Sequence, residues 1–251
     1  MTKRPYLLRL CILSTFIWVN TQAQLDKTQN IDTSTDYGKL IFFDDFERNE
    51  SQELKDEVGN NWTTSSDKTA KGHKEVDLKD GLMHIYIHKE ANHAVSVRQK
   101  MNFKDGTIEM DFKLNHLEDI LVLNIADPTC KSVHAGHLIN VKIKTGSVEL
   151  QDLKTGVFLL EHVKARKEKN LTKEQKLLIK SKSKKISNTI ELGKWMHVVA
   201  QIQEEKLTVI INGKEIGSFV SNGIGHHAKS LLRILVPRKV TVDNLKIWRK
   251  K

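Results

Sequence analysis

The sequence predicts an all-β protein in which two antiparallel sheets pack into a sandwich. Roughly a dozen short segments alternate apolar and polar residues, which is the pattern of strands with one buried face. Gly, Asp and Asn mark the breaks between these segments, and only three prolines interrupt the chain. Because such a sandwich buries every second residue of each strand, the alternation supplies both halves of one core.

The first residues predict export. Basic residues at positions 3, 4 and 9 precede a mostly apolar run over residues 10–19, and Thr21 and Ala23 are the compact residues that a signal peptidase reads. The apolar run is too short to cross a bilayer, and no later stretch is apolar enough, so no membrane span is expected. We therefore expect a secreted or periplasmic protein. Its parts are a signal peptide, a flexible leader and one sandwich domain, over residues 1–23, 24–38 and 39–251.

Cysteine content and charge argue against a disulfide-stabilised extracellular module and against a nucleic-acid-binding protein. Once the signal peptide is removed, Cys130 is the sole cysteine, so an internal disulfide is excluded and a core must stabilise the fold. The remaining chain has 38 Lys and Arg against 31 Asp and Glu, a net charge of +7. Aromatic residues make up only 6% of the chain and export removes it from nucleic acid, so no nucleic-acid partner is expected.

Each expected strand follows from its own stretch of alternation. In chain order the strands cover residues 40–46, 75–78, 83–88, 94–101, 106–114, 120–125, 137–143, 147–153, 191–203, 206–211, 215–220, 231–236 and 240–248. Asp80-Gly81 and Asn212-Gly213 are strong hairpin signals between neighbouring strands. Ile108 and Met110 alternate with charged residues and so point inward. Residues 120–125 are apolar at both parities, which predicts a central strand covered on both faces.

One segment breaks this rhythm. Residues 161–185 hold ten Lys or Arg against three Glu and show no strand alternation. Residues 171–174 resemble a helix start, and Leu177, Leu178 and Ile179 form a short apolar stripe. We expect a short basic helical insertion there. It is either a solvated surface excursion or an arm for an anionic partner, such as a sulfated or uronic polysaccharide or a lipid headgroup surface.

Two passages near the end resemble a known superfamily. Residues 191–199 (ELGKWMHVV) and 207–217 (LTVIINGKEIG) are similar to the GxWHxV and LxVxxNGKxxG pattern of laminin-G-like and other concanavalin-like domains. Residues 242–248 resemble the final strand of the same superfamily, which returns beside the first. The resemblance implies a concanavalin-like jelly roll in which Trp195 packs between the sheets at the start of a strand.

The opening of the domain carries a second resemblance. Residues 43–47 (FDDFE), 59–62 (GNNW) and 78–82 (LKDGL) are similar to the start of secreted bacterial proteins of the 3-keto-disaccharide hydrolase family, loosely grouped with family 16 glycoside hydrolases. Residues 103–112 and 132–137 fit the same group. The resemblance implies an exported protein that cleaves or processes a glycoside. The alternatives are a non-catalytic laminin-G-like module that binds carbohydrate or a partner, and an interaction protein that works through its basic insertion.

One strand carries two carboxylates that can be compared with the catalytic motif of family 16 glycoside hydrolases. Alternation places Glu109 and Asp111 on one face, as in the E-x-D start of the family 16 motif. The third position is Lys113 or Leu114, and neither can act as the acid. Because retaining hydrolysis needs a second carboxyl across the sugar bond, this strand disfavours family 16 hydrolysis.

Polar residues at strand ends are the candidates for the site. An imidazole acts as acid or base near neutral pH, which suits a 3-keto sugar, whose ketone acidifies the neighbouring C–H. Thr145-Gly146 closes a hairpin that brings His137 and Asp152 roughly opposite each other, and these are the expected catalytic residues. The expected substrate-binding residues are His93, Arg98, Asn124, Asp127 and His134. A His-x-x-His bend with no firm third ligand is weak grounds for a metal, so no metal or cofactor is expected. The alternative is a structural hydrogen-bond network.

Overall fold

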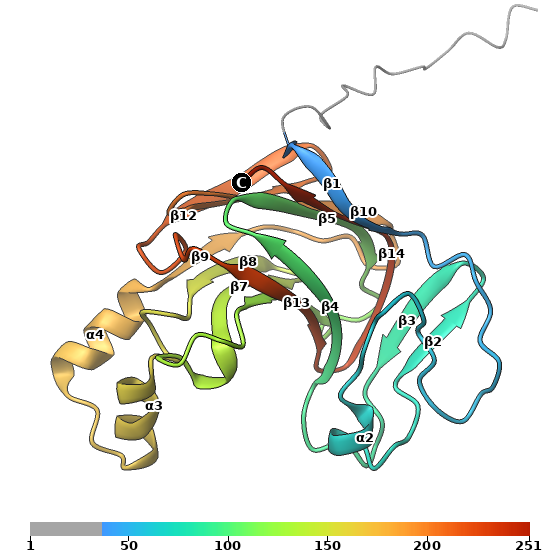
Figure 1. The fold of residues 1–251 in the computed structure, drawn as a ribbon, viewed down its shortest axis with the longest axis horizontal. Coiled ribbons are helices and arrows are strands. Elements are labelled where there is room, and N and C mark those ends of the chain that lie inside the picture. The colour runs from blue at the N-terminus through green and yellow to red at the C-terminus, as the bar shows by residue number, and fades with distance from the viewer. Residues whose placement is uncertain (1–36) are drawn as a thin grey trace, which may run out of the picture. The chain divides into compact units, whose positions relative to one another are not determined.

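Two antiparallel sheets lie face to face in the computed structural model, which describes residues 37–251 (Figure 1). The larger sheet has the order β12-β11-β10-β5-β14-β3-β2, and β1 also pairs with β14. Its strands are β1 (Lys39–Asp44), β2 (Val76–Lys79), β3 (Leu82–Tyr86), β5 (Gly106–Lys113), β10 (Met196–Gln203), β11 (Lys206–Ile211), β12 (Lys214–Val220) and β14 (Lys239–Arg249). The expected signal peptide and nearly all of the expected leader lie outside the described residues.

The smaller sheet has the order β4-β13-β6-β7-β8-β9. Its strands are β4 (Val95–Phe103), β6 (Ile120–Ala126), β7 (His137–Lys144), β8 (Ser147–Asp152), β9 (Ser183–Ser187) and β13 (Lys229–Val236). This sheet forms the inner side of a curved sandwich, so the face turned away from the core is concave (Figure 1). The all-β jelly-roll sandwich predicted from the sequence is confirmed.

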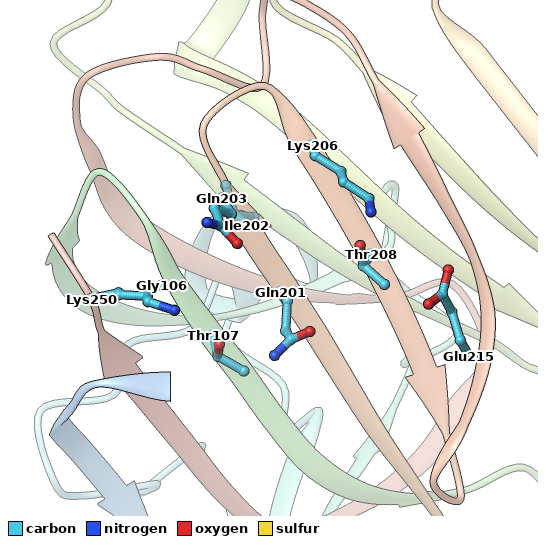
Figure 2. Close-up of a pocket in the computed structure, with 9 residues that line it drawn as sticks. All are labelled: Gly106, Thr107, Gln201, Ile202, Gln203, Lys206, Thr208, Glu215 and Lys250. Atoms are coloured by element: carbon cyan, nitrogen blue, oxygen red, sulfur yellow. The ribbon is translucent and has the colours of Figure 1, made fainter. Parts of the chain in front are cut away.

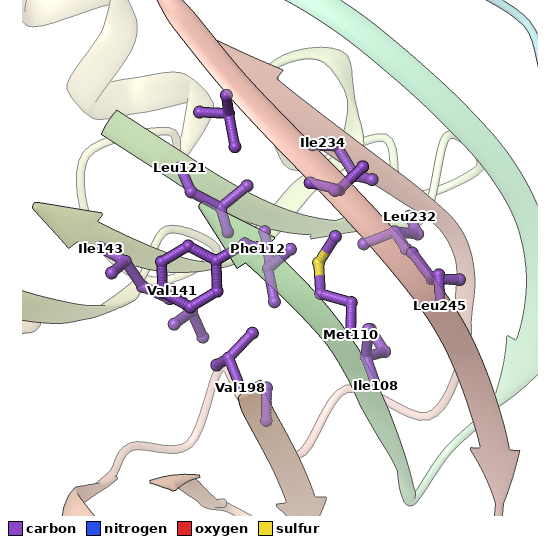
Figure 3. Packing of buried hydrophobic residues seen from close by; sticks show 14 of the residues in the cluster. Ile108, Met110, Phe112, Leu121, Val141, Ile143, Val198, Leu232, Ile234 and Leu245 are labelled. Carbon is purple, nitrogen blue, oxygen red and sulfur yellow. The ribbon is translucent and has the colours of Figure 1, made fainter. Parts of the chain in front are cut away.

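The core lies between the two sheets. Ile108, Met110 and Phe112 of β5 are fully buried, as the alternation predicted, and they pack toward Leu121 of β6 and Ile234 of β13 (Figure 3). Burying one such side chain stabilises the folded state by about 1.5–3 kcal/mol. Within residues 37–251 the core therefore stabilises the fold without a disulfide, and Cys130 is a free thiol.

The hairpin turns and the pairing of the first strand with the last strand also agree with the sequence predictions. Asp80 and Asn212 both have left-handed backbone, with φ of 55° and 50°, and a glycine with positive φ follows each. Such turns match the twist of the strands that they join. The last strand returns beside the first, since Lys39 pairs with Arg249.

The expectation for Trp195 is wrong. Its side chain is 42% exposed, and Nζ of Lys113 lies 4.7 Å from the ring centroid. Gly193 adopts φ of 71° in a turn, so residues 191–195 are not part of the strand, and β10 begins only at Met196. Trp62, by contrast, is buried, and its indole N–H donates to Oδ2 of Asp44 at 2.7 Å.

The basic insertion contains two helices, α3 (Leu160–Lys167) and α4 (Lys173–Ser181), in addition to the short helix α2 (Ser66–Thr69) earlier in the chain. Thr172 caps α4 in a reciprocal box with Gln175. The expected helical character ends at α4, because Ser183–Ser187 is strand β9, which pairs with the edge of β8. Nothing in residues 37–251 forms a helix long and apolar enough for a membrane crossing.

Candidate functional site

A row of polar residues crosses the concave face of the smaller sheet in register. Residues paired across neighbouring antiparallel strands project from the same face, and here each pair continues into the next. The row consists of Arg98 (β4), Arg233 (β13), Asn124 (β6), Asn140 (β7), Gln151 (β8) and Ser183 (β9). On β13, β6 and β7, the residues directly before and after the row residue point to the other face of the sheet, into the core. The sheet therefore presents an amide and guanidinium row opposite its apolar face.

Hydrogen bonds join the middle of this row. The amide nitrogen of Asn124 donates to Oδ1 of Asn140 at 2.7 Å, and that of Asn140 donates to Oε1 of Gln151 at 3.1 Å. The amide nitrogen of Gln151 then donates to Oε1 of Glu149 at 3.1 Å. Because each amide donates to its neighbour, the three side chains are held in fixed orientations.

His137 lies beside this row. Its Nδ1 is 2.8 Å from Oδ1 of Asn124, and Nη1 of Arg233 is 2.9 Å from the same ring nitrogen. The Asn124 amide nitrogen is already a donor to two acceptors, so its oxygen accepts from a proton on Nδ1 of His137. With that proton in place, the guanidinium of Arg233, which can only donate, has Nε2 as its acceptor on the ring, 3.4 Å from Nη1. Nε2 therefore carries a lone pair. Burial, and then the positive charge of Arg233, lower the pKa of His137 to about 4, so the imidazole is neutral at neutral pH.

A short bend before β7 positions this histidine. Ala135 and Gly136 both have left-handed backbone, with φ of 50° and 70°, and Nη2 of Arg233 donates to the carbonyl oxygen of Ala135 at 2.9 Å. The ring of His137 stacks on Phe158, with centroids 4.8 Å apart and planes 25° from parallel. The bend and the aromatic ring together fix the direction of the imidazole.

A pocket of about 370 Å³ opens between β4, β13 and the bend. It is lined by His93, Arg98, His137 and Arg233, together with Ser65 and Ser96. Neither guanidinium forms an ion pair with a carboxylate anywhere in residues 37–251. The pocket thus combines a neutral base, two unpaired positive charges and hydroxyl groups.

Five of the seven expected site residues gather here. His93, Arg98 and His137 line the pocket, and Asn124 lies behind His137. His134 is exposed next to them, with its ring stacked 5.9 Å from Phe158.

Asp127 does not reach the pocket. It is buried at the end of β6, where its carboxylate accepts from Thr129 at 2.7 Å and contacts Nε2 of His226 at 3.0 Å. Burial would raise the pKa of this carboxyl, but the hydrogen bonds from His226 and Thr129 outweigh it and lower the pKa to about 2. Asp127 therefore ties β6 to the segment before β13.

Asp152 is also separated from His137. It pairs in register with Ile139, a core residue, so its side chain leaves the sheet on the face opposite the polar row. Its carboxylate accepts from Ser221, Thr155 and the backbone N–H of Gly223. The hairpin was expected correctly, but its register does not place Asp152 opposite the imidazole.

Comparison with known proteins bears on the fold. Neither the protein-family models nor the curated proteins gave a match to this sequence.

Solved structures do match. A family 16 endo-β-1,3(4)-glucanase, SCLam, co-crystallised with a glucose oligosaccharide at its active site, superposes with a TM-score of 0.58 at 12% identity, over 86% of this chain and 96% of that one. The laminarinase from Flavobacterium sp. UMI-01 gives 0.55 at 12% identity, over 84% and 100%. The Bacillus licheniformis β-glucanase gives 0.54 at 10% identity, over 85% and 99%. The chain has the jelly-roll fold of these glucanases. At such identities the likeness concerns the fold alone.

Within this glucanase fold, Glu109 and Asp111 do share one face of β5, as expected. That face is the convex one, because Ile108 and Met110 point into the core. His197 of β10 lies opposite, with Nδ1 2.7 Å from Asp111 and Nε2 3.7 Å from Glu109. Hydrogen bonds to the two carboxylates raise the pKa of His197 to about 9. The two carboxylates are thus already neutralised and lie away from the concave row.

A second polar row lies on the convex face of the same fold. Thr107, Gln201 and Thr208 are paired in register across β5, β10 and β11, and they line a pocket of about 200 Å³ (Figure 2). Lys206 and Glu215 close one side of it. This pocket holds hydrogen-bonding groups, but no histidine lines it, so it offers a binding surface without a base.

The acidic group Glu50, Glu53 and Asp77 is the one described cluster with metal-ligand spacing. Nζ of Lys74 lies at its centre, 2.6, 2.9 and 2.6 Å from the three carboxylates. The ammonium group therefore takes the place that a cation would need.

Some residues of the site were missed in the sequence. Arg233 is a single charged residue among the apolar residues of β13. A lone charge in an apolar strand indicates a polar site on one face of the sheet, so the sequence pattern could have identified it. Asn140 and Gln151 alternate with core residues and offered the same signal. Phe158 lies in an irregular loop between β8 and α3, and no local pattern marked it.

Proposed function

We propose that this protein binds a carbohydrate along the concave face and cleaves a glycosidic bond, with His137 as the base. The observation that carries the proposal is the neutral imidazole of His137, whose Nε2 lies in the pocket beside a row of amides and guanidinium groups, 3.4 Å from Nη1 of Arg233. Sugar hydroxyls pair with amides and arginines.

The charges on this face favour elimination over double displacement. Glu149 is the carboxylate that shares the described concave strands, and it accepts from Gln151 and Ser183. Retaining hydrolysis requires two carboxyl groups on either side of the sugar bond, and the concave strands do not provide the second. A single base suffices where a carbonyl group acidifies a neighbouring C–H of the sugar.

The proposed step balances with one residue. Nε2 of His137 takes the proton from the carbon next to the carbonyl group, and the electron pair of that C–H bond forms a carbon–carbon double bond. The glycosidic C–O bond breaks, and the imidazolium returns the proton to the departing oxygen. A 3-keto glycoside, the substrate class implied by the resemblance at residues 43–47 and 59–62, meets this requirement. Arg233 supports the step because its charge keeps the free imidazole unprotonated.

Export remains part of the proposal. The basic start and apolar run of residues 1–23 support it. Expression of the full chain in a secreting host, followed by intact mass analysis of the exported protein, tests it. A mature N-terminus at Gln24 is expected, and an uncleaved chain retained inside the cell contradicts export.

A binding module without turnover is the second candidate. The polar row continues well beyond His137, to Gln151 and Ser183, which is more surface than one base requires. A module of this kind holds a glycan and releases it unchanged.

One experiment separates the two candidates. The mature protein is incubated with 3-keto and unmodified glycosides, and binding and product are measured on the same samples. If the protein is an enzyme, the wild type forms a new reducing or unsaturated product, and His137→Ala does not form it. Binding without any product, equal in the wild type and in His137→Ala, supports the module and rejects the enzyme.

A further inference from the structure

We propose that the sugar recognised at the concave pocket is a uronic acid, whose carboxylate is held between Arg98 and Arg233. The inference rests on the proposed function and names its substrate class. It replaces the ketone of a 3-keto glycoside by a carboxylate as the group that acidifies the C–H.

The two arginines form an unusual pair. Arg98 and Arg233 are directly opposite each other in the β4–β13 register. Like charges in that position destabilise a sheet unless an anion lies between them. Burial, and then Arg98, lower the pKa of Arg233 to about 10, so Arg233 stays charged at neutral pH. An unfavourable pair in a pocket indicates a ligand that compensates it.

Their present hydrogen bonds leave donors for that ligand. Nε of Arg98 donates to Oγ of Ser96 at 3.0 Å, and within residues 37–251 its two terminal nitrogens make no hydrogen bond. Arg233 contacts the carbonyl oxygen of Ala135, the side-chain oxygen of Asn124 and the ring of His137 through its two terminal nitrogens, which leaves its Nε–H without a partner in residues 37–251. Guanidinium groups bind carboxylates through two parallel N–H donors, a geometry that a neutral sugar hydroxyl cannot match.

Lysines outnumber carboxylates on the rest of the concave face. Lys142 and Lys185 flank Glu149 in register on the two neighbouring strands, and Lys100 and Lys144 share their face. Lys180, Lys182 and Lys185 line a second pocket of about 430 Å³ at the far side of the sheet, together with the carboxylates of Glu149 and Asp152. A basic surface that extends over the whole sheet fits a polymer of acidic sugars better than a single one.

The chemistry follows from the same geometry. Neutralising the carboxylate with two guanidinium groups acidifies the C5–H beside it. Nε2 of His137 takes that proton, the C–H electrons form the C4=C5 double bond, and the C4–O bond to the neighbouring sugar breaks. The imidazolium returns the proton to the departing oxygen. The product is an unsaturated uronate, whose double bond is conjugated with its carboxylate and absorbs in the ultraviolet.

The test compares polyuronates with the same polymers after chemical reduction of their carboxyl groups. Galacturonate, glucuronate, mannuronate and guluronate polymers form the panel, 3-keto glycosides are included, and binding and ultraviolet absorbance are both recorded. Binding of at least one polyuronate is expected to exceed that of its reduced counterpart about tenfold or more, equivalent to about 1.4 kcal/mol. Absorbance is expected to rise with that polyuronate only.

Arg98→Gln and Arg233→Gln are the test variants, and Lys214→Gln, an exposed lysine of β12, is the control for the loss of one charge. Each arginine variant is expected to lose about tenfold or more in polyuronate binding with no change for the reduced polymer, whereas Lys214→Gln keeps the wild-type preference. Arg98 is on an edge strand, so Arg98→Gln retains the test if Arg233→Gln fails to fold.

Two outcomes overturn the inference in different ways. Equal binding of native and reduced polymers, or arginine variants that bind like Lys214→Gln, rules out the carboxylate contact. Cleavage of 3-keto glycosides without cleavage of any polyuronate rejects the uronate substrate and leaves the proposed function standing. Absence of binding and cleavage with every compound rejects both.

Discussion

The side-chain oxygen of Asn124 contacts the imidazole of His137. Oδ1 of Asn124 lies 2.8 Å from Nδ1 of His137, and the amide nitrogen of Asn124 donates to the carbonyl oxygen of Ile139 at 3.1 Å. Because Asn124 is fully buried at the centre of the sheet, its amide cannot turn without losing these bonds. With the proton of the imidazole on Nδ1, its unprotonated nitrogen points away from Asn124 and lies 3.4 Å from Nη1 of Arg233.

His137→Ala is expected to lower the rate of glycan cleavage by about 10²–10⁴-fold, the contribution of a positioned general base. Because the ring contacts the buried oxygen of Asn124, the variant is also expected to lose about 1–3 kcal/mol of stability, so the rate is compared per folded molecule. In the wild type, the rate should rise with pH through the pKa of about 4 and then stay level. His116→Ala, which removes an exposed histidine, is the control. A wild-type rate in His137→Ala contradicts the role of this residue.

His137 also predicts a dependence of stability on pH. Its folded pKa of about 4 lies below the ordinary 6.5, so its neutral form stabilises the fold above pH 6.5, and this contribution is lost as the pH falls toward 4. Urea unfolding at several pH values should show this loss in the wild type and a reduced loss in His137→Ala.

Asp152→Asn is expected to lower the free energy of unfolding by about 1–3 kcal/mol, because the buried carboxylate accepts from Ser221, Thr155 and Gly223 N–H. Cleavage per folded molecule should stay unchanged, since the side chain points away from the concave row. Chemical denaturation and an activity assay on the same preparation check both. Glu191→Gln, an exposed carboxylate, serves as the matched control. Lost activity with wild-type stability would restore Asp152 to the site.

Replacing residues 169–180 by a short Gly/Ser linker is expected to leave the sandwich folded. Residues of α4 are largely exposed, with Leu177 60% exposed, and β9 remains in place. The free energy of unfolding should change by less than about 1 kcal/mol. A wider deletion that also removes β9 uncovers the edge of β8 and should reduce solubility. Loss of a cooperative transition in the shorter deletion would mean that α4 is part of the core.

His197 predicts a second pH effect, of opposite sign. Its folded pKa of about 9 exceeds the ordinary 6.5, so its ion pairs with Asp111 and Glu109 stabilise the fold fully below pH 6.5, and this contribution disappears as the pH rises through 9. The side chain is partly exposed, so solvent screens the effect. His197→Gln should flatten the stability profile between pH 6.5 and 9. An unchanged profile would show that the convex cluster has no such coupling.

The local pattern of apolar and polar residues was enough to predict most of the strands. The alternation of Ile108 and Met110 with charged residues depends on neighbours two positions apart, and the same holds for the left-handed turns at Asp80 and Asn212. Trp195 shows the limit of a resemblance, since one glycine turn moved it to the surface. Strand β9 was hidden for a related reason: its polar residues form a strand only because β8 offers an open edge.

The sequence by itself determined that the chain alternates as a sandwich does, and that His93, Arg98, Asn124, His134 and His137 are polar residues at the strands that carry the pocket. Only the tertiary structure decided which of them meet. Arg98, Asn124 and Arg233 are far apart along the chain and become neighbours through strand order and register. Asp152 was lost from the site for the same reason, because a side chain changes face with every residue along a strand, and one step in register sends it to the opposite side of the sheet.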